Sequence, residues 1–266
     1  MDKNYILFID SGVGGLSILK YFLDLENRVN IIYFADTLNY PYGKKDEKVL
    51  GNILFNIYSS LKNQFNISLI VIACNTASVS ALAFLRSKVS VPIIGTVPAI
   101  KPAARLTKNN KIGIIATETT TKLDYIQNLI KEFAKDKEVF IKSSSKLVDA
   151  VELFYSTDKV KSLIEEELSF FVEKNIDVLV LGCTHYSFLI EEINLFFKNK
   201  VKVIDSREGV SKRIIHLLPK EIKDNNPKKI LFISSPDPEI HKKYKRFNEI
   251  LNIFDSIEYY EILPFN

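Results

Sequence analysis

Short apolar runs alternate along this chain with longer stretches in which apolar residues recur every three or four positions. Runs of four or five apolar residues are typical of strands buried on both faces, and the longer periodic stretches are typical of amphipathic helices. The alternation predicts βαβ units, and therefore an α/β fold with mostly parallel sheets. We expect strands near residues 5–9, 31–34, 69–73, 93–95, 111–115, 139–141, 178–181, 201–204 and 230–233, and helices near 16–25, 45–64, 78–87, 121–133, 159–174 and 186–197.

The chain also contains a faint internal repeat. The segment Ile6–Ser11 resembles Ile112–Thr117, and an expected helix follows each. Asp10 precedes Cys74 by 64 positions, and Thr117 precedes Cys183 by 66. Two similar halves could therefore face each other across a cleft, each supplying one thiol. The alternative is that any doubly wound sheet shows such a similarity between its strand–helix units.

The two cysteines of the chain stand in matching contexts. Cys74 ends the run Ser68–Cys74 and precedes Asn75-Thr76, whereas Cys183 ends Ile176–Cys183 and precedes Thr184-His185. Each thiol thus falls where a buried strand runs out into a loop, at the edge where open α/β sheets bind ligands. A lone buried cysteine is usually a small hydrophobic residue, but two in equivalent places indicate chemistry. His185 is close enough in sequence to influence its thiol.

A structural role for these residues is the alternative to catalysis. Cys74, Cys183 and His185 could supply three ligands to zinc, but they lack the usual close spacing of paired ligands, so we expect no metal. A disulfide between the two cysteines is disfavoured if the compartment is reducing.

Two polar segments follow the first two expected strands. The segment Asp10–Gly15 opens a helix, where free N–H groups could attract an anion. It is neither a dinucleotide fingerprint, since Ser17 occupies the third glycine position, nor a P-loop; a tight turn is the alternative. Burying Asp10 at a strand end is costly without a task. Asp36-Thr37 and then Asn39–Gly43 would suit a loop that covers a small ligand, or an ordinary surface turn.

Composition excludes several classes of protein. The chain of 266 residues is 47% hydrophobic and 26% charged, which is typical of a globular protein. Its net charge of +4 is spread along the sequence, so we expect no nucleic-acid partner. No segment reaches membrane-spanning length without charges, and no export signal precedes the first apolar run, so we expect no membrane association and a cytoplasmic location.

Six segments, in order, resemble the cofactor-independent glutamate racemases of the aspartate/glutamate racemase superfamily. The resemblance covers roughly the first two hundred residues and fades after about Ser206. One departure is Ser187-Phe188, where the family commonly has Pro-Leu, and it concerns the entry to the following helix more than the chemistry. The matching segments are Asp10–Leu16, Ala35–Thr37, Tyr40–Gly43, Ala73–Ser78, Val97–Pro102 and Leu181–Tyr186.

The resemblance implies two similar doubly wound domains, residues 1–97 with 207–266 and residues 98–206, with the active site in the cleft between them. It implies a cytoplasmic enzyme that interconverts L- and D-glutamate without any cofactor, supplies D-glutamate for peptidoglycan, and could form a homodimer. By position, Cys74 and Cys183 match the catalytic thiols, with Asp10 and His185 as their catalytic polar partners. The substrate-binding positions are Asp10, Ser11, Tyr42, Gly43, Asn75, Thr76, Thr184 and His185, and the supporting acidic positions are Asp36 and Glu152.

The chemistry expected of two thiols is consistent with this resemblance. Inverting an α-carbon without a cofactor needs a thiolate on one face and a thiol on the other, and cysteine ionises near enough to neutrality for both tasks. Fixed donors around the α-carboxylate must stabilise the carbanion, and Ser11, Asn75, Thr76 and Thr184 are the candidates. The alternatives are a sister racemase or isomerase acting on aspartate, a hydantoin or maleate, and a non-catalytic amino-acid-binding module.

Overall fold

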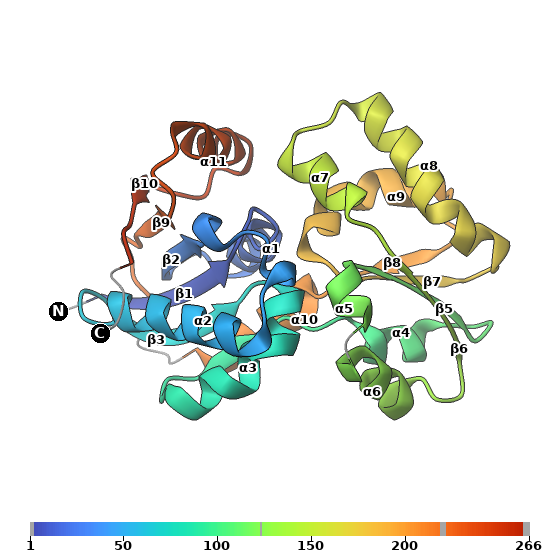
Figure 1. Ribbon diagram of the computed structural model, residues 1–266, viewed down its shortest axis with the longest axis horizontal. Helices are drawn as coiled ribbons and strands as arrows, with labels where there is room; N and C mark the ends of the chain where they lie inside the picture. Colours follow the sequence, from blue (N-terminus) through green and yellow to red (C-terminus); the bar gives the residue numbers. More distant parts are fainter. Residues whose placement is uncertain (1–2, 123, 219–221, 263–266) are drawn as a thin grey trace. The chain divides into compact units, whose positions relative to one another are not determined.

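The structure is a computed structural model that describes residues 3–122, 124–218 and 222–262 (Figure 1). The chain forms two compact units, one comprising residues up to Thr96 and from Arg207 onward, the other Val97–Ser206. Each unit is built on one sheet in which every strand pairing is parallel. The expected α/β class with parallel sheets is thus confirmed.

The first unit has six strands in the order β10-β9-β2-β1-β3-β4. The helices α2 and α3 pack together on one face of this sheet, and α1 and α10 pack together on the other (Figure 1). The strands are β1 Asn4–Asp10, β2 Asn30–Ala35, β3 Asn66–Ile72, β4 Ile93–Gly95, β9 Lys229–Ile233 and β10 Ser256–Tyr259; the helices are α1 Leu16–Leu25, α2 Glu47–Leu61, α3 Asn75–Lys88, α10 Arg207–Leu217 and α11 Pro238–Leu251, with short 3₁₀ helices η1 Thr37–Asn39 and η2 Tyr42–Lys44.

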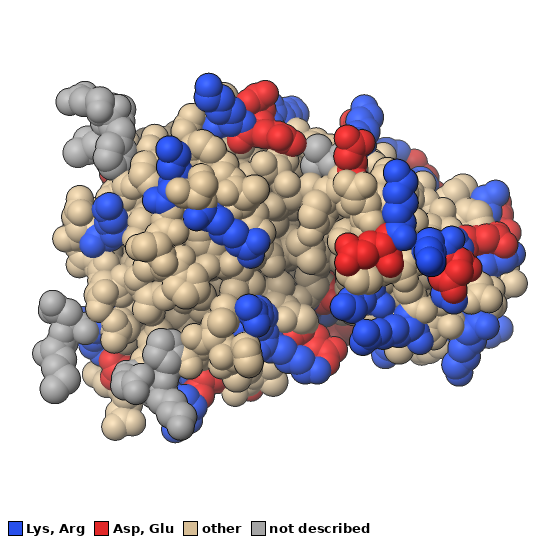
Figure 2. All heavy atoms as spheres, turned by 90° about the horizontal axis from the view of Figure 1, so that it is seen from below, with Lys and Arg blue, Asp and Glu red and all other residues tan. Residues whose placement is uncertain are grey.

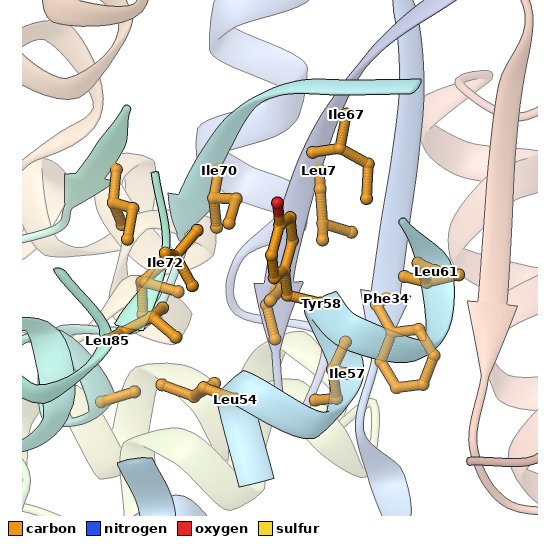
Figure 3. Packing of buried hydrophobic residues seen from close by; sticks show 14 of the residues in the cluster. Leu7, Phe34, Leu54, Ile57, Tyr58, Leu61, Ile67, Ile70, Ile72 and Leu85 are labelled. Atoms are coloured by element: carbon orange, nitrogen blue, oxygen red, sulfur yellow. The ribbon is translucent and has the colours of Figure 1, made fainter. Parts of the chain in front are cut away.

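Apolar side chains on both faces hold this sheet in place. Leu7 of β1 points into the core under α2 and α3 (Figure 3), whereas Phe8 contacts Phe22 of α1 on the opposite face. Burial on both faces is why the strands appear in the sequence as unbroken apolar runs. The core shown in Figure 3 includes Leu54, Ile57, Tyr58, Leu61, Ile70, Ile72 and Leu85.

The second unit has four strands in the order β6-β5-β7-β8. Ile100 and Ile126 bring α4 and α6 against one face of its sheet, and Phe171 of α8 packs over Gly113 of β5 on the other. The strands are β5 Lys111–Ala116, β6 Glu138–Ser143, β7 Val178–Leu181 and β8 Lys202–Ile204; the helices are α4 Ile100–Leu106, α5 Glu118–Lys122, α6 Asp124–Phe133, α7 Lys146–Glu152, α8 Thr157–Glu173, η3 Thr184–Leu189 and α9 Ile190–Phe196.

The two sheets share an arrangement, as the sequence repeat predicts. The order β2-β1-β3-β4 in one corresponds to β6-β5-β7-β8 in the other. At the strand ends the hydrogen bonds also correspond: Ala73 N–H donates to Ile9 O at 2.8 Å, and Gly182 N–H donates to Ile115 O at 2.7 Å. Cys74 and Cys183 each follow directly, so the two thiols occupy equivalent positions in their sheets.

Some expectations from the sequence differ from the structure. The helix expected at 186–197 begins as the 3₁₀ helix η3 and becomes α-helical only at Ile190. Helix α3 begins at Asn75, three residues before the expected start, because polar Asn75 and Thr76 form its first turn. The helix expected at 121–133 corresponds to α5 and α6, with residue 123 outside the described residues. Strand β10 and helices α4, α7, α10 and α11 were not among the expected ranges.

The surface carries mixed charges. On the face drawn in Figure 2, Lys and Arg side chains are interspersed with Asp and Glu side chains. Several charged side chains form ion pairs with a residue one turn away in the same helix, as in Lys20–Asp24 of α1 and Lys212–Glu208 of α10. Among the helices of the described ranges, none is both long and apolar enough to cross a membrane.

Candidate active site

Three predicted site residues of the first unit meet at the carboxyl edge of its sheet. Asp10 ends β1, Asp36 follows β2 and Cys74 follows β3. Because β1 lies between β2 and β3 and all three run parallel, their ends are adjacent. The Asp36 N–H donates to Asp10 O at 2.8 Å, which ties the first two loops together.

The Asp10 carboxylate is held by the glycine-rich loop that follows it. Its Oδ1 accepts from Ser11 N–H and its Oδ2 from Gly15 N–H, both at 2.6 Å, and only 1% of the residue is exposed. Gly15 is required for this fit, since a Cβ there would lie 2.8 Å from both Ala73 Cβ and Tyr33 Oη. Two loop N–H groups that the sequence suggested for an external anion therefore bind Asp10 itself.

Asp36 lies at the centre of a buried hydrogen-bond network. Both carboxylate oxygens accept from Asn39 Nδ2 at 3.0 Å, Oδ2 accepts from Tyr42 Oη at 3.0 Å, and Oδ1 accepts from Ser234 Oγ at 3.3 Å. Burial raises the pKa of Asp36, while the three donors act in the opposite direction. The network fixes a carboxylate beneath the loop that carries Tyr42 and Gly43.

Tyr42 is almost fully buried and remains a phenol. Burial is the main cause that raises its pKa well above the ordinary value, followed by the charge and hydrogen bond of Asp36 and the charges of Asp10 and Cys74. Its hydroxyl therefore lies within electrostatic reach of both groups at the sheet edge. The structure thus groups Tyr42 with Asp10, Asp36 and Cys74.

Cys74 is the N-cap residue of α3, a position where the helix dipole stabilises negative charge. It is half-buried, and Asn75 and Thr76 form the first turn of the helix behind it. The Asn75 Nδ2 is buried and has no hydrogen-bond partner within the described residues. A buried amide donor without a partner is costly, which indicates that a ligand supplies the missing acceptor.

In the second unit, Cys183, His185 and Glu152 form a buried row. The Cys183 Sγ lies 3.7 Å from His185 Nδ1, and His185 Nε2 lies 2.7 Å from Glu152 Oε1. Burial by itself lowers the pKa of His185, but the hydrogen bonds and negative charges of Cys183 and Glu152 outweigh it and raise that pKa well above its usual range. An imidazolium therefore sits between the thiol and the carboxylate, with Thr184 buried beside it.

Each unit thus brings together its own share of the predicted residues. Asn39 and Ser234, which both contact Asp36, were not among the predicted site residues, and neither were Thr117 and Thr120 of the second unit. Thr117 holds the place in the second sheet that Ser11 holds in the first, and its hydroxyl lies 2.9 Å from that of Thr120. The internal repeat was the signal for Thr117, whereas nothing local in the sequence indicated Ser234.

Within the described part of the chain, no group of three or more His, Cys, Asp or Glu side chains is arranged to hold a metal ion. The geometry is that of a thiol with a carboxylate and a phenol near it in one unit, and a thiol with an imidazolium in the other. Such groups can remove and deliver protons near neutral pH.

Comparison with known proteins identifies the family. The model of the Asp/Glu/Hydantoin racemase family matches residues 29–208. This chain belongs to that family. Among family members, a glutamate racemase of Aliivibrio fischeri strain MJ11 is 43% identical over 217 residues, covering 80% of this chain and 81% of the relative. A glutamate racemase of Shewanella frigidimarina is 39% identical over 221 residues, covering 83% and 85%.

Solved structures of this racemase family resemble the chain over nearly its whole length. Escherichia coli glutamate racemase, in complex with L-glutamate and an activator, has a TM-score of 0.89 at 31% identity and covers 98% of this chain and 100% of that one. The Francisella tularensis enzyme in complex with D-glutamate has a TM-score of 0.80 at 27% identity, covering 98% and 99%. An aspartate racemase homologue from Pyrococcus horikoshii has a TM-score of 0.53 at 21% identity, which shows a shared fold alone.

Proposed function

We propose that this protein interconverts L-glutamate and D-glutamate by transferring protons between the substrate α-carbon and two thiols, Cys74 and Cys183. The observation that carries the proposal is the equivalence of the two cysteines. Each follows a strand-end residue whose N–H bonds to the neighbouring central strand, at 2.8 Å for Ala73 and 2.7 Å for Gly182. Each therefore stands at the ligand-binding edge of its own sheet.

The reaction needs one thiolate and one thiol, on opposite sides of the α-carbon. The thiolate takes the α-proton, the electron pair stays on the α-carbon as a carbanion, and the second thiol delivers its proton to the other face. By resemblance to the family, Cys74 takes the proton from D-glutamate and Cys183 takes it from L-glutamate. After one inversion the two sulfur atoms have exchanged protonation states, so the enzyme is poised for the reverse direction.

The partners of each thiol support these roles differently. Asp10 is fixed near Cys74 by backbone N–H groups, and His185 is fixed near Cys183 by Glu152. A carboxylate and an imidazolium can each exchange protons with the reacting groups. The charge of the imidazolium also stabilises a neighbouring thiolate, which suits Cys183 to act as a base.

Carbanion formation from an amino acid requires donors aimed at the substrate. The Asn75 Nδ2, which is buried and has no partner among the described residues, is the group that the structure leaves available for this purpose. We propose Ser11, Thr76 and Thr184 as further contacts to the substrate, together with the loop of Tyr42 and Gly43. None of these groups requires a cofactor.

Glutamate is favoured over aspartate by the relatives. The chain is 39–43% identical to glutamate racemases over four-fifths of its length, whereas the aspartate racemase homologue shares the fold alone. We further infer that the enzyme acts in the cytoplasm and supplies D-glutamate for peptidoglycan. A homodimer is a further prediction, which sedimentation velocity of the purified protein tests.

The decisive experiment is a racemisation assay of purified protein with L- and D-glutamate, with both aspartate enantiomers as the comparison. We expect interconversion of glutamate, and abolition by either Cys74→Ala or Cys183→Ala. Replacement by serine should be nearly as severe, because a hydroxyl is far too weakly acidic to ionise here. Turnover of aspartate alone would support the sister activity, and binding of glutamate without turnover would support a binding module.

A further inference from the structure

We propose that Ser234, in the C-terminal part of the chain, is a positioning residue for the active-site loop of the first unit. Its hydroxyl holds the Asp36 carboxylate in the orientation that receives the Tyr42 phenol. The inference rests on the proposed function, since it assigns Ser234 to the racemisation site. Ser234 lies outside the segment 29–208 that the family model matches.

The sheet order places Ser234 directly beside Asp36. Strand β9 pairs with β2, with Ile233 opposite Ala35, and the Ser234 N–H donates to Ala35 O at 3.1 Å. The next residue of each strand is therefore Ser234 on one and Asp36 on the other. Only 1% of Ser234 is exposed, so its hydroxyl has to find partners within the protein.

The Ser234 hydroxyl lies 3.5 Å from Thr37 Oγ1 and makes two shorter bonds with distinct effects. It donates to Asp36 Oδ1 at 3.3 Å, and it accepts from Leu38 N–H at 3.0 Å. The first bond orients the carboxylate, and the second fixes the backbone of η1, which leads into the loop of Tyr42. A single side chain thus holds both the carboxylate and the start of the loop.

Asp36 passes this constraint to Tyr42. Its other oxygen, Oδ2, accepts from Tyr42 Oη at 3.0 Å, and Tyr42 is in turn influenced by the charges of Asp10 and Cys74. Only three side chains donate to this buried carboxylate in the described network: Asn39, Tyr42 and Ser234. Loss of one donor leaves the carboxylate freer to rotate and the phenol less firmly held.

Ser235 provides a matched control. Its Oγ accepts from Asp237 N–H at 3.1 Å, and its backbone N–H donates to Thr37 Oγ1 at 3.1 Å, a bond that an alanine would keep. Ser235 is 5% exposed, so Ser235→Ala removes a buried hydroxyl from the same segment without removing a bond to Asp36. A difference between the two variants therefore reports the contacts of the Ser234 hydroxyl with Asp36 and the start of the loop, and the Asp36→Asn background separates the Asp36 contact from the rest.

The test compares Ser234→Ala, Ser235→Ala, Asp36→Asn and the Ser234→Ala/Asp36→Asn double variant. We expect Ser234→Ala to lower kcat about 10-fold with a smaller change in KM, since a hydrogen bond to a buried charge is lost. The acidic limb of the pH–rate profile of Ser234→Ala should move to higher pH, because the Ser234 bond acts to lower the pKa of Asp36. Ser235→Ala should resemble the wild type in both respects. In the Asp36→Asn background, Ser234→Ala should add little further loss.

A second measurement does not depend on turnover. In protein labelled with ¹³C at the aspartate carboxyl carbons, the resonance absent from Asp36→Asn identifies Asp36. Its titration should move to higher pH in Ser234→Ala and not in Ser235→Ala. An active wild type in which Ser234→Ala changes neither rate nor titration would overturn the inference, as would a rate loss that is fully additive with Asp36→Asn. Failure of the proposed function would instead appear as a wild type that does not racemise glutamate.

Discussion

His185 Nε2 lies 2.7 Å from Glu152 Oε1, and both residues are only 6% exposed. The contact joins the end of α7 to the start of η3, 33 positions apart in sequence. It holds the imidazole so that its other nitrogen, Nδ1, points to Cys183 Sγ at 3.7 Å. The proton state of His185 therefore depends on Glu152.

Replacing Glu152 with glutamine should move the alkaline limb of the rate profile to lower pH. The hydrogen bond and negative charge of Glu152 raise the pKa of His185, and the neutral amide removes that charge. The imidazolium then loses its proton at lower pH, so the rate above neutrality should fall about 10-fold or more. Rate profiles of Glu152→Gln and wild type between pH 6 and 10 provide the measurement. An alkaline limb that stays in place would show that Glu152 does not control His185.

The same row should make folding stability depend on pH. Because the pKa of His185 is raised in the folded protein, the folded state holds a proton that the unfolded state releases near pH 6.5. The resulting stabilisation is fully present below about pH 6.5 and is lost as the pH rises through the folded-state pKa. Urea unfolding at several pH values should show a steeper alkaline loss for the wild type than for His185→Gln. Parallel curves for the two proteins would contradict this assignment.

Asn75→Ala should separate activity from stability. The Asn75 Nδ2 is buried with no partner among the described residues, so its removal should leave the free energy of unfolding unchanged or raise it by about 1 kcal/mol. Racemase activity should fall about 10-fold or more, because the substrate loses a fixed donor. The control is Asn30→Ala, since Asn30 Nδ2 donates to Asn4 O and Asp224 Oδ2, both at 3.2 Å, and its loss should destabilise the protein. Destabilisation by Asn75→Ala comparable to that control would argue against a ligand-binding amide.

Gly182→Ala should disturb Cys183 through packing. A Cβ at position 182 would lie 2.8 Å from Ala116 Cβ, so β7 and β5 would have to separate where the thiol is placed. We expect a loss of about 1–3 kcal/mol in unfolding free energy, with reduced activity. Gly209→Ala is the matched control, because nothing lies within 4 Å of a Cβ there and alanine favours the helix by about 1 kcal/mol. Equal effects of the two substitutions on stability would refute the close contact.

The sequence predicted those parts of the fold that depend on local patterns. All nine expected strands are present in the structure. They could be recognised because parallel strands buried on both faces consist of nearly continuous apolar residues. Strand β10 was missed because Ser256–Tyr259 is half-exposed and lacks such a run. Cys74, Cys183 and Asp10 could be selected because each stands at a strand end. Ser234 could not, since its role depends on β9 lying beside β2, a pairing between segments about two hundred residues apart.

The two-thiol mechanism is tested most directly by isotope exchange in heavy water. Wild-type protein is given protiated L-glutamate or D-glutamate, and the α-deuterium content of substrate and product is measured by mass spectrometry during the first few per cent of turnover. Separate bases predict product that carries one solvent deuterium, while the recovered substrate remains protiated, in both directions. Deuterium appearing in recovered substrate as fast as in product would indicate a single base shared by both faces, and would contradict the assignment of Cys74 and Cys183.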